Sequence, residues 1–150
     1  MRKFLTGLII VVLAVGIALA VAWPYLKMEF SSSAYYTEKD RLEYEYYTPE
    51  LLKKMPRISA KYEFDFANIS GPEAHVFTVR FYDVTETQAI RDYLKSAGYE
   101  PQKSCDVEAE CWRSHTSNDV VTVANILSQK GIFVQIYRSP YTEPLIDSKG

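Results

Sequence analysis

The N-terminal part of the chain is a continuous run of apolar positions. Residues 4–23, FLTGLIIVVLAVGIALAVAW, contain no charged side chain, and Arg2 and Lys3 come directly before them. A helix of that length rises about 30 Å, which matches the hydrocarbon layer of a bilayer. The pattern predicts a transmembrane helix over 4–23. It disfavours the core helix of a soluble protein, because the run has no polar stripe.

The flanking charges predict the orientation of this helix. Basic side chains stay preferentially on the cytoplasmic side, so we expect residues 1–3 in the cytoplasm and the rest across the membrane. The expected location is the inner (plasma) membrane of a bacterium, as a single-pass protein with a periplasmic domain. The alternative is a signal peptide that is cleaved near Ala20 or Ala22, which would give a secreted protein. The length of the run favours a retained signal-anchor.

After the apolar run, the pattern changes to short segments of mixed polarity. Residues 24–34 include three consecutive serines and are expected to form a tether, followed by one exported domain over 35–141 and a frayed tail over 142–150. Two proline residues, Pro140 and Pro144, break the pattern near the end of the chain.

Five of the chain's 12 tyrosines lie between positions 35 and 47. Within this segment Leu42, Tyr44 and Tyr46 alternate with Glu43 and Glu45, which predicts a half-buried strand. Tyrosines also supply rigid contact area for a partner, so Tyr44 and Tyr46 are candidate binding residues as well. The period-two spacing favours the structural interpretation.

The remaining pattern alternates between strand and helix periods. Strands are expected at 58–66, 76–84, 111–115, 120–126 and 132–138. Thr48-Pro49-Glu50 begins a short helix that ends at Pro56, and Thr85-Glu86-Thr87-Gln88 has the sequence of a capping box for a longer helix. Gly98 is placed to end that helix in the left-handed conformation.

This order of elements predicts an α+β fold. The expected domain follows the N-terminal transmembrane helix and has a mostly antiparallel sheet of about four to six strands, with one main helix packed on one face.

The charge of the exported part argues against one class of partner. The first 23 residues hold two of the 17 Lys and Arg and none of the 19 Asp and Glu, so the remainder has 15 basic and 19 acidic side chains, a formal charge of −4. A mildly acidic domain without a basic run has little attraction for phosphate backbones, so no nucleic acid is expected as a partner.

Cys105 and Cys111 are the only cysteines of the chain. In an oxidising compartment the natural prediction is a disulfide between them, with free thiols as the alternative. A zinc site would need more ligands at paired spacing, and five intervening residues do not make a Cys-x-x-Cys redox motif.

The search for catalytic chemistry finds no established motif. No cofactor is expected and no metal ligands are assigned, since the alternate carboxylates Asp106, Glu108 and Glu110 are a weak calcium pattern without further ligands. In the strand over 111–115, His115 shares a face with Arg113, and we expect the pair to lie near Arg80 on another strand. These three residues join the tyrosines as candidate binding residues.

The sequence therefore favours a non-catalytic binding or inhibitory module at the membrane. A protein partner in the envelope is expected, as for an immunity-type protein or an accessory subunit of an envelope complex. The alternative is a small envelope hydrolase or transferase that uses His115 with a carboxylate, and that requires the two groups within about 3 Å in a concave pocket. The oligomeric state stays open.

Overall fold

The computed structural model describes residues 1–105, 109–126 and 128–145. The chain divides into two compact units, Met1–Ser31 and the part from Ser32 onwards, and each is described by itself.

The first unit is the helix α1, Arg2–Phe30. By length and composition it is a candidate membrane span, and it is the one such helix within the described residues. The expected tether over 24–34 is wrong at both ends, because the helix continues through Pro24 to Phe30 and a strand begins at Ser33. A proline removes one backbone donor, but Leu26, Lys27 and Met28 after it are good helix formers and the helix continues.

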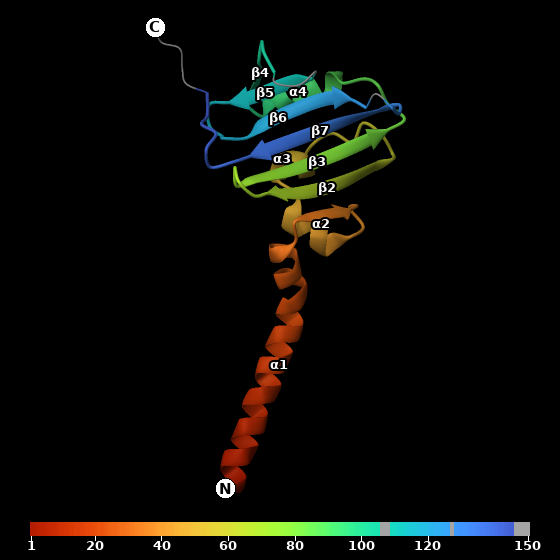
Figure 1. The fold of residues 1–150 in the computed structure, drawn as a ribbon. Helices are drawn as coiled ribbons and strands as arrows, with labels where there is room; N and C mark the ends of the chain where they lie inside the picture. Colours follow the sequence, from red (N-terminus) through yellow and green to blue (C-terminus); the bar gives the residue numbers. More distant parts are fainter. Residues whose placement is uncertain (106–108, 127, 146–150) are drawn as a thin grey trace. The chain divides into compact units, whose positions relative to one another are not determined.

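The second unit is an antiparallel sheet with three short helices (Figure 1). In chain order its elements are β1 (Ser33–Tyr36), α2 (Arg41–Tyr47), α3 (Glu50–Lys53), β2 (Tyr62–Ile69), β3 (Ala74–Tyr82), α4 (Gln88–Ser96), β4 (Tyr99–Pro101), β5 (Glu110–Ser114), β6 (Val120–Asn125) and β7 (Gly131–Arg138). The strand order in the sheet is β1-β2-β3-β7-β6-β5-β4, and every neighbouring pair is antiparallel. The α+β class with an N-terminal apolar helix is confirmed.

The sheet has seven strands, so the expected four to six was too few. The two missed strands, β1 and β4, are the edges and are only four and three residues long. Segments this short carry too little alternation to be recognised, and they are strands because β2 and β5 pair with them. The strand expected at 58–66 begins only at Tyr62. Before Tyr62, the Ser59 hydroxyl donates to the Tyr82 carbonyl and accepts from the Lys61 backbone N–H. These side-chain bonds replace the backbone hydrogen bonds that would extend the strand.

The strand expected at 42–46 is wrong, since Arg41–Tyr47 is the helix α2. Helical spacing brings Tyr44 and Tyr47 onto one side, where Tyr44 meets Phe64 edge-on at 5.3 Å and Tyr47 stacks on Phe66 at 4.7 Å between ring centroids. These aromatic contacts outweigh the period-two pattern.

The start of α4 also differs from the expectation. The helix begins after Thr87, which makes no side-chain capping bond, so the capping box is wrong. Gln88 instead donates to Asp92 at 2.9 Å, one turn along the helix. The helix does end as expected, because Gly98 has φ +91° and its N–H donates to the Lys95 carbonyl.

Alternation along the strands gives the sheet two different faces. One face is the core, and its largest fully buried side chains in the strands are Phe64, Val79, Phe81, Trp112, Val121, Val123, Ile132, Val134 and Ile136. Ile90 and Leu94 of α4 are fully buried, and Figure 1 shows α3 and α4 behind the strands. The opposite face, turned toward the viewer in Figure 1, is called the open face below.

Candidate functional site

A hollow lies over the open face. It has a volume of 1380 Å³ and is lined by residues of β3, β5, β6 and β7, by Arg91 of α4, and by the loops at the strand ends. On its floor lie Arg80, Cys111, Arg113, Val120, Thr122, Ala124, Phe133, Gln135 and Tyr137. All of them occupy the strand positions that alternate with the buried core, so the pleat of the sheet projects them away from it.

The strand register arranges this floor as rows. Gln135 of β7 lies directly between Thr78 of β3 and Thr122 of β6. Two residues earlier in β7, and on the same face, Phe133 lies between Arg80 and Ala124. The floor therefore has a polar centre with an aromatic ring on each side, since Tyr137 is the next residue of β7 on this face.

Two polar side chains of the floor form no side-chain hydrogen bond within the part of the chain that the structure describes. They are Gln135 and Tyr137, and both are half-buried. Buried and half-buried polar groups are normally paired with protein or water. These two groups are thus available to a ligand or a partner.

The two arginines of the floor differ in their surroundings. Arg80 forms an ion pair with Asp65 of β2, whose side chain is only 13% exposed. Burial raises the pKa of Asp65 and outweighs the opposing effect of the Arg80 charge. Arg113 has no carboxylate within ion-pair distance among the described residues, and it donates from Nη2 to the Glu143 carbonyl. Its Nε is buried without a partner.

The cysteines border the same hollow. Cys105 and Cys111 lie at disulfide distance, with 5.5 Å between their Cα atoms, and both line the hollow. Of the weak calcium candidates between them, Asp106 and Glu108 lie outside the described residues. Glu110 is held by Arg91 of α4, with Nε 3.0 Å from Oε2 and Nη2 2.6 Å from Oε1. Within the described part of the chain no cluster of three or more potential metal ligands is present.

His115 lies apart from the hollow. Its Nε2 is 3.0 Å from Oε2 of Glu100 and its Nδ1 is 2.9 Å from the Leu145 carbonyl, and it is not among the lining residues. Arg113 and Arg80 do line one hollow, but β3 and β5 are separated by β7 and β6. The expectation that His115 lies near Arg80 is therefore wrong, because sequence alternation places residues on a face without giving the strand order.

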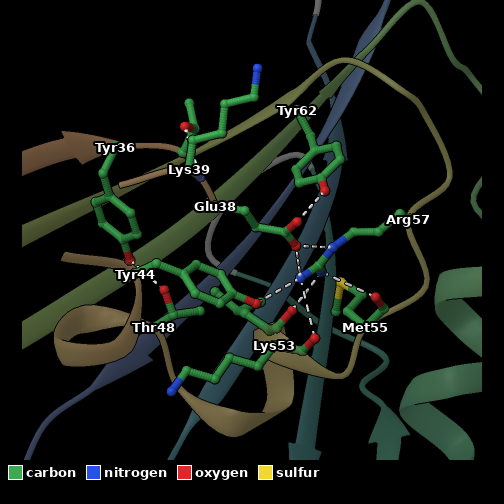
Figure 2. Close-up of polar contacts among 11 residues, drawn as sticks. Tyr36, Glu38, Lys39, Tyr44, Thr48, Lys53, Met55, Arg57 and Tyr62 are labelled. Atoms are coloured by element: carbon green, nitrogen blue, oxygen red, sulfur yellow. Dashed lines mark hydrogen bonds and ion pairs between the residues drawn. The ribbon is translucent and has the colours of Figure 1, made fainter. Parts of the chain in front are cut away.

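Tyr44, one of the two tyrosine candidates, belongs to a second cluster, centred on Arg57 (Figure 2). The Arg57 guanidinium donates to the hydroxyl of Tyr44 at 3.0 Å and to the carbonyls that end α3, those of Leu52, Lys53 and Met55. It also lies over the rings of Tyr62 and Phe64, at 5.2 and 5.5 Å from their centroids. Tyr44 is thus committed to an internal contact, while Tyr46 is 38% exposed and packs edge-on against Tyr47.

Glu38 completes this cluster. Its Oε1 accepts from Arg57 and its Oε2 accepts from the Tyr62 hydroxyl at 2.7 Å. The Tyr62 bond, and then Arg57, lower the pKa of Glu38. Burial raises the pKa of Tyr44 and raises that of Tyr36, which bonds to Thr48, to about 12. The cluster holds the segment from β1 to α3 on the sheet, and the buried polar atoms that lack a partner in the described part of the chain lie elsewhere.

Sequence reasoning missed the residues at the centre of the hollow. The strand at 132–138 was expected, and its Ile132, Val134 and Ile136 form the core face. The sequence did contain a signal, in the residues that alternate with these core positions. They are Phe133, Gln135 and Tyr137, and two aromatic side chains are unusual on the solvent side of a strand.

Comparisons with known proteins do not assign the chain to a family. No protein-family model matches it, and neither curated proteins nor solved structures gave a match.

Proposed function

We propose that the protein is a membrane-anchored, non-catalytic binding module whose contact surface is the hollow on the open face. The observation that carries the proposal is the floor of that hollow, where Gln135 and Tyr137 have no side-chain hydrogen-bond partner in the described ranges and lie beside Phe133. Aromatic side chains next to unused polar groups are typical of interface centres. Both an immunity-type protein and an accessory subunit of an envelope complex fit this function.

The location is part of the proposal. The apolar helix α1 is long enough to cross a membrane, and the positive-inside rule applied to Arg2 and Lys3 puts its start in the cytoplasm. The cysteine pair at disulfide distance fits an oxidising compartment on the other side. We therefore place the domain in the periplasm, held at the inner membrane by α1.

One observation favours a second candidate, a hydrolase or transferase that uses His115 with Glu100. The 3.0 Å between Nε2 and Oε2 meets the distance that acid–base catalysis requires. However, the other ring nitrogen faces the Leu145 carbonyl, and the pair is outside the hollow. A substrate held in the hollow would not be in contact with His115, so we favour the binding function.

A photo-crosslinking amino acid at the rim of the hollow tests the binding function. It replaces Thr142, which lines the hollow, in the full chain expressed in cells, and a matched chain carries it at the exposed Lys95 of α4. The expected result is a discrete adduct from position 142 only, which weakens when Tyr137 is replaced by alanine and is unchanged by His115→Ala. Equal adducts from both positions, or none from 142 in folded protein, would overturn the proposal.

A further inference from the structure

The charges around the hollow differ from those of the domain as a whole. The exported part has a formal charge of −4 from its composition. Among the described residues that line the hollow, the charged side chains are Arg80, Arg91, Arg113 and Glu110. Among its described lining residues the hollow thus holds three cationic side chains and one anionic side chain, the reverse of the acidic balance of the domain, and this favours an anionic occupant.

Not every one of these cations is available. Arg91 is held by Glu110, and Arg80 is paired with Asp65. Arg113 differs from both, because its described partner is the neutral carbonyl of Glu143 and not a carboxylate. A guanidinium binds a carboxylate through two parallel hydrogen bonds, and exchanging a carbonyl for a carboxylate would strengthen its contacts. Arg113 is thus the point at which an anionic group is expected.

The size of the hollow indicates what kind of ligand carries that group. Small-molecule pockets have volumes of roughly 300–1,000 Å³ and enclose most of their ligand. The hollow has 1380 Å³ and extends over four strands of an open sheet. At the usual strand spacing, Arg80 and Arg113 are roughly 20 Å apart along the diagonal of the floor. An extended peptide of about six residues has this length.

The floor between the two arginines suits a polypeptide. Gln135 has an amide that donates and accepts, as a peptide backbone requires, and Thr122 lies directly opposite it. Phe133, Ala124 and the cysteine pair offer apolar contacts beside this polar centre. We propose that the hollow binds an extended, acidic segment of a partner protein, with a carboxylate at Arg113 and the segment's main chain at Gln135. This inference rests on the proposed binding function and names the class of its partner.

The test uses a defined probe and the full chain in a neutral detergent. A fluorescent hexapeptide that alternates glutamate and valine is compared with its twin, in which each glutamate is glutamine, by fluorescence anisotropy. A charged hydrogen bond contributes about 1.5–3 kcal/mol, so we expect the glutamate peptide to bind roughly tenfold or more tightly than its twin. Arg113→Gln should remove this preference, and Arg113→Lys should retain part of it.

A variant that binds the peptide more tightly tests recognition directly, because a misfolded variant would lose binding. Ala124→Lys adds a cation to the floor without touching Gln135, and Ala89→Lys makes the same change on the exposed surface of α4. The first variant should bind the glutamate peptide several-fold more tightly than wild type, while the second should match wild type. Succinate as a competitor identifies a small dicarboxylate as the occupant if it displaces the peptide at equal concentration, and that result would overturn the polypeptide assignment.

The two proposals can fail separately. If the glutamate and glutamine peptides bind equally, or if the two lysine variants behave alike, the acidic segment is wrong. The binding function would still stand in that case if position 142 gives its discrete adduct. Absence of both the adduct and the peptide preference would remove both proposals.

Discussion

Arg57 donates from Nε to Oε1 of Glu38 at 2.9 Å, and this bond joins residues that are 19 positions apart in the chain. Among the described residues the guanidinium forms no other ion pair, and its remaining N–H groups donate to the Tyr44 hydroxyl and to the carbonyls at the end of α3 and just after it. Arg57 therefore links the tyrosine-rich segment to the sheet, and it commits the Tyr44 hydroxyl to an internal hydrogen bond.

Replacing Arg57 by alanine should destabilise the domain by about 2 kcal/mol or more. The substitution leaves Glu38 without its cation and leaves several carbonyls without a donor, and bonds to charged groups are worth about 1.5–3 kcal/mol each in mutational series. The measurement is urea unfolding of the full chain followed by near-ultraviolet circular dichroism. Lys54→Ala, at a side chain that is 75% exposed, is the matched control and should shift the midpoint little. Equal midpoints for the two variants would contradict the role of Arg57.

The pKa of Glu38 gives this cluster a pH dependence. The Tyr62 hydroxyl, and then Arg57, lower the folded-state pKa below its unfolded value. A lowered carboxyl pKa adds stability above the unfolded value of about 4.3, and this stability is lost as the pH falls through the folded value. Glu38→Gln should therefore be less stable than wild type at neutral pH, and the difference should shrink as the pH falls below about 4.

Urea midpoints of both proteins across this pH range are the measurement. Tyr62→Phe is the control that identifies the cause, because it removes the first of the two groups that lower the pKa. In that background the stability lost to acid should be smaller. A constant difference between wild type and Glu38→Gln at every pH would show that Glu38 contributes by packing and not by its charge.

The cysteine pair gives a prediction for the proposed compartment. Cys105 and Cys111 close a short loop at the edge of the hollow, and closing such a loop is worth about 2 kcal/mol in the chain-entropy model. The double serine variant should lose that amount of unfolding free energy. In membranes prepared without reductant, a maleimide should label wild-type protein only after dithiothreitol is added. Labelling without reductant would contradict an oxidised pair and, with it, the periplasmic location.

Sequence patterns predicted the long strands better than the short elements. Val134 and Ile136 are part of a strand long enough for period-two alternation to identify it. The five residues from Leu42 to Tyr46 also alternate, yet they form a helix because Tyr44 and Tyr47 contact rings that lie in β2. Such contacts depend on the tertiary structure and are invisible in a local pattern.

The candidate site shows the same limit. Arg80 and Arg113 were recognised as candidates, and both line the hollow. Gln135 and Tyr137 could be recognised as site residues only from the strand order. That order puts β7 between β3 and β6, and so at the middle of the floor. Alternation identifies the side of the sheet on which a residue lies, but the order of strands is a property of the whole fold.

Gly131, at the start of β7, should not tolerate even a methyl group. A Cβ atom there would lie 2.7 Å from the carbonyl oxygen of Phe81 and 3.1 Å from Cδ1 of Ile126. Because the closer atom belongs to the backbone of β3, the two strands would have to separate, and overpacking of this kind costs about 1–3 kcal/mol. Gly131→Ala should lower the urea midpoint accordingly. Adding Ile126→Ala should not restore it, since that change relieves only the side-chain contact. If the double variant has the same urea midpoint as the single variant Ile126→Ala, the close approach of β3 and β7 at this position is wrong.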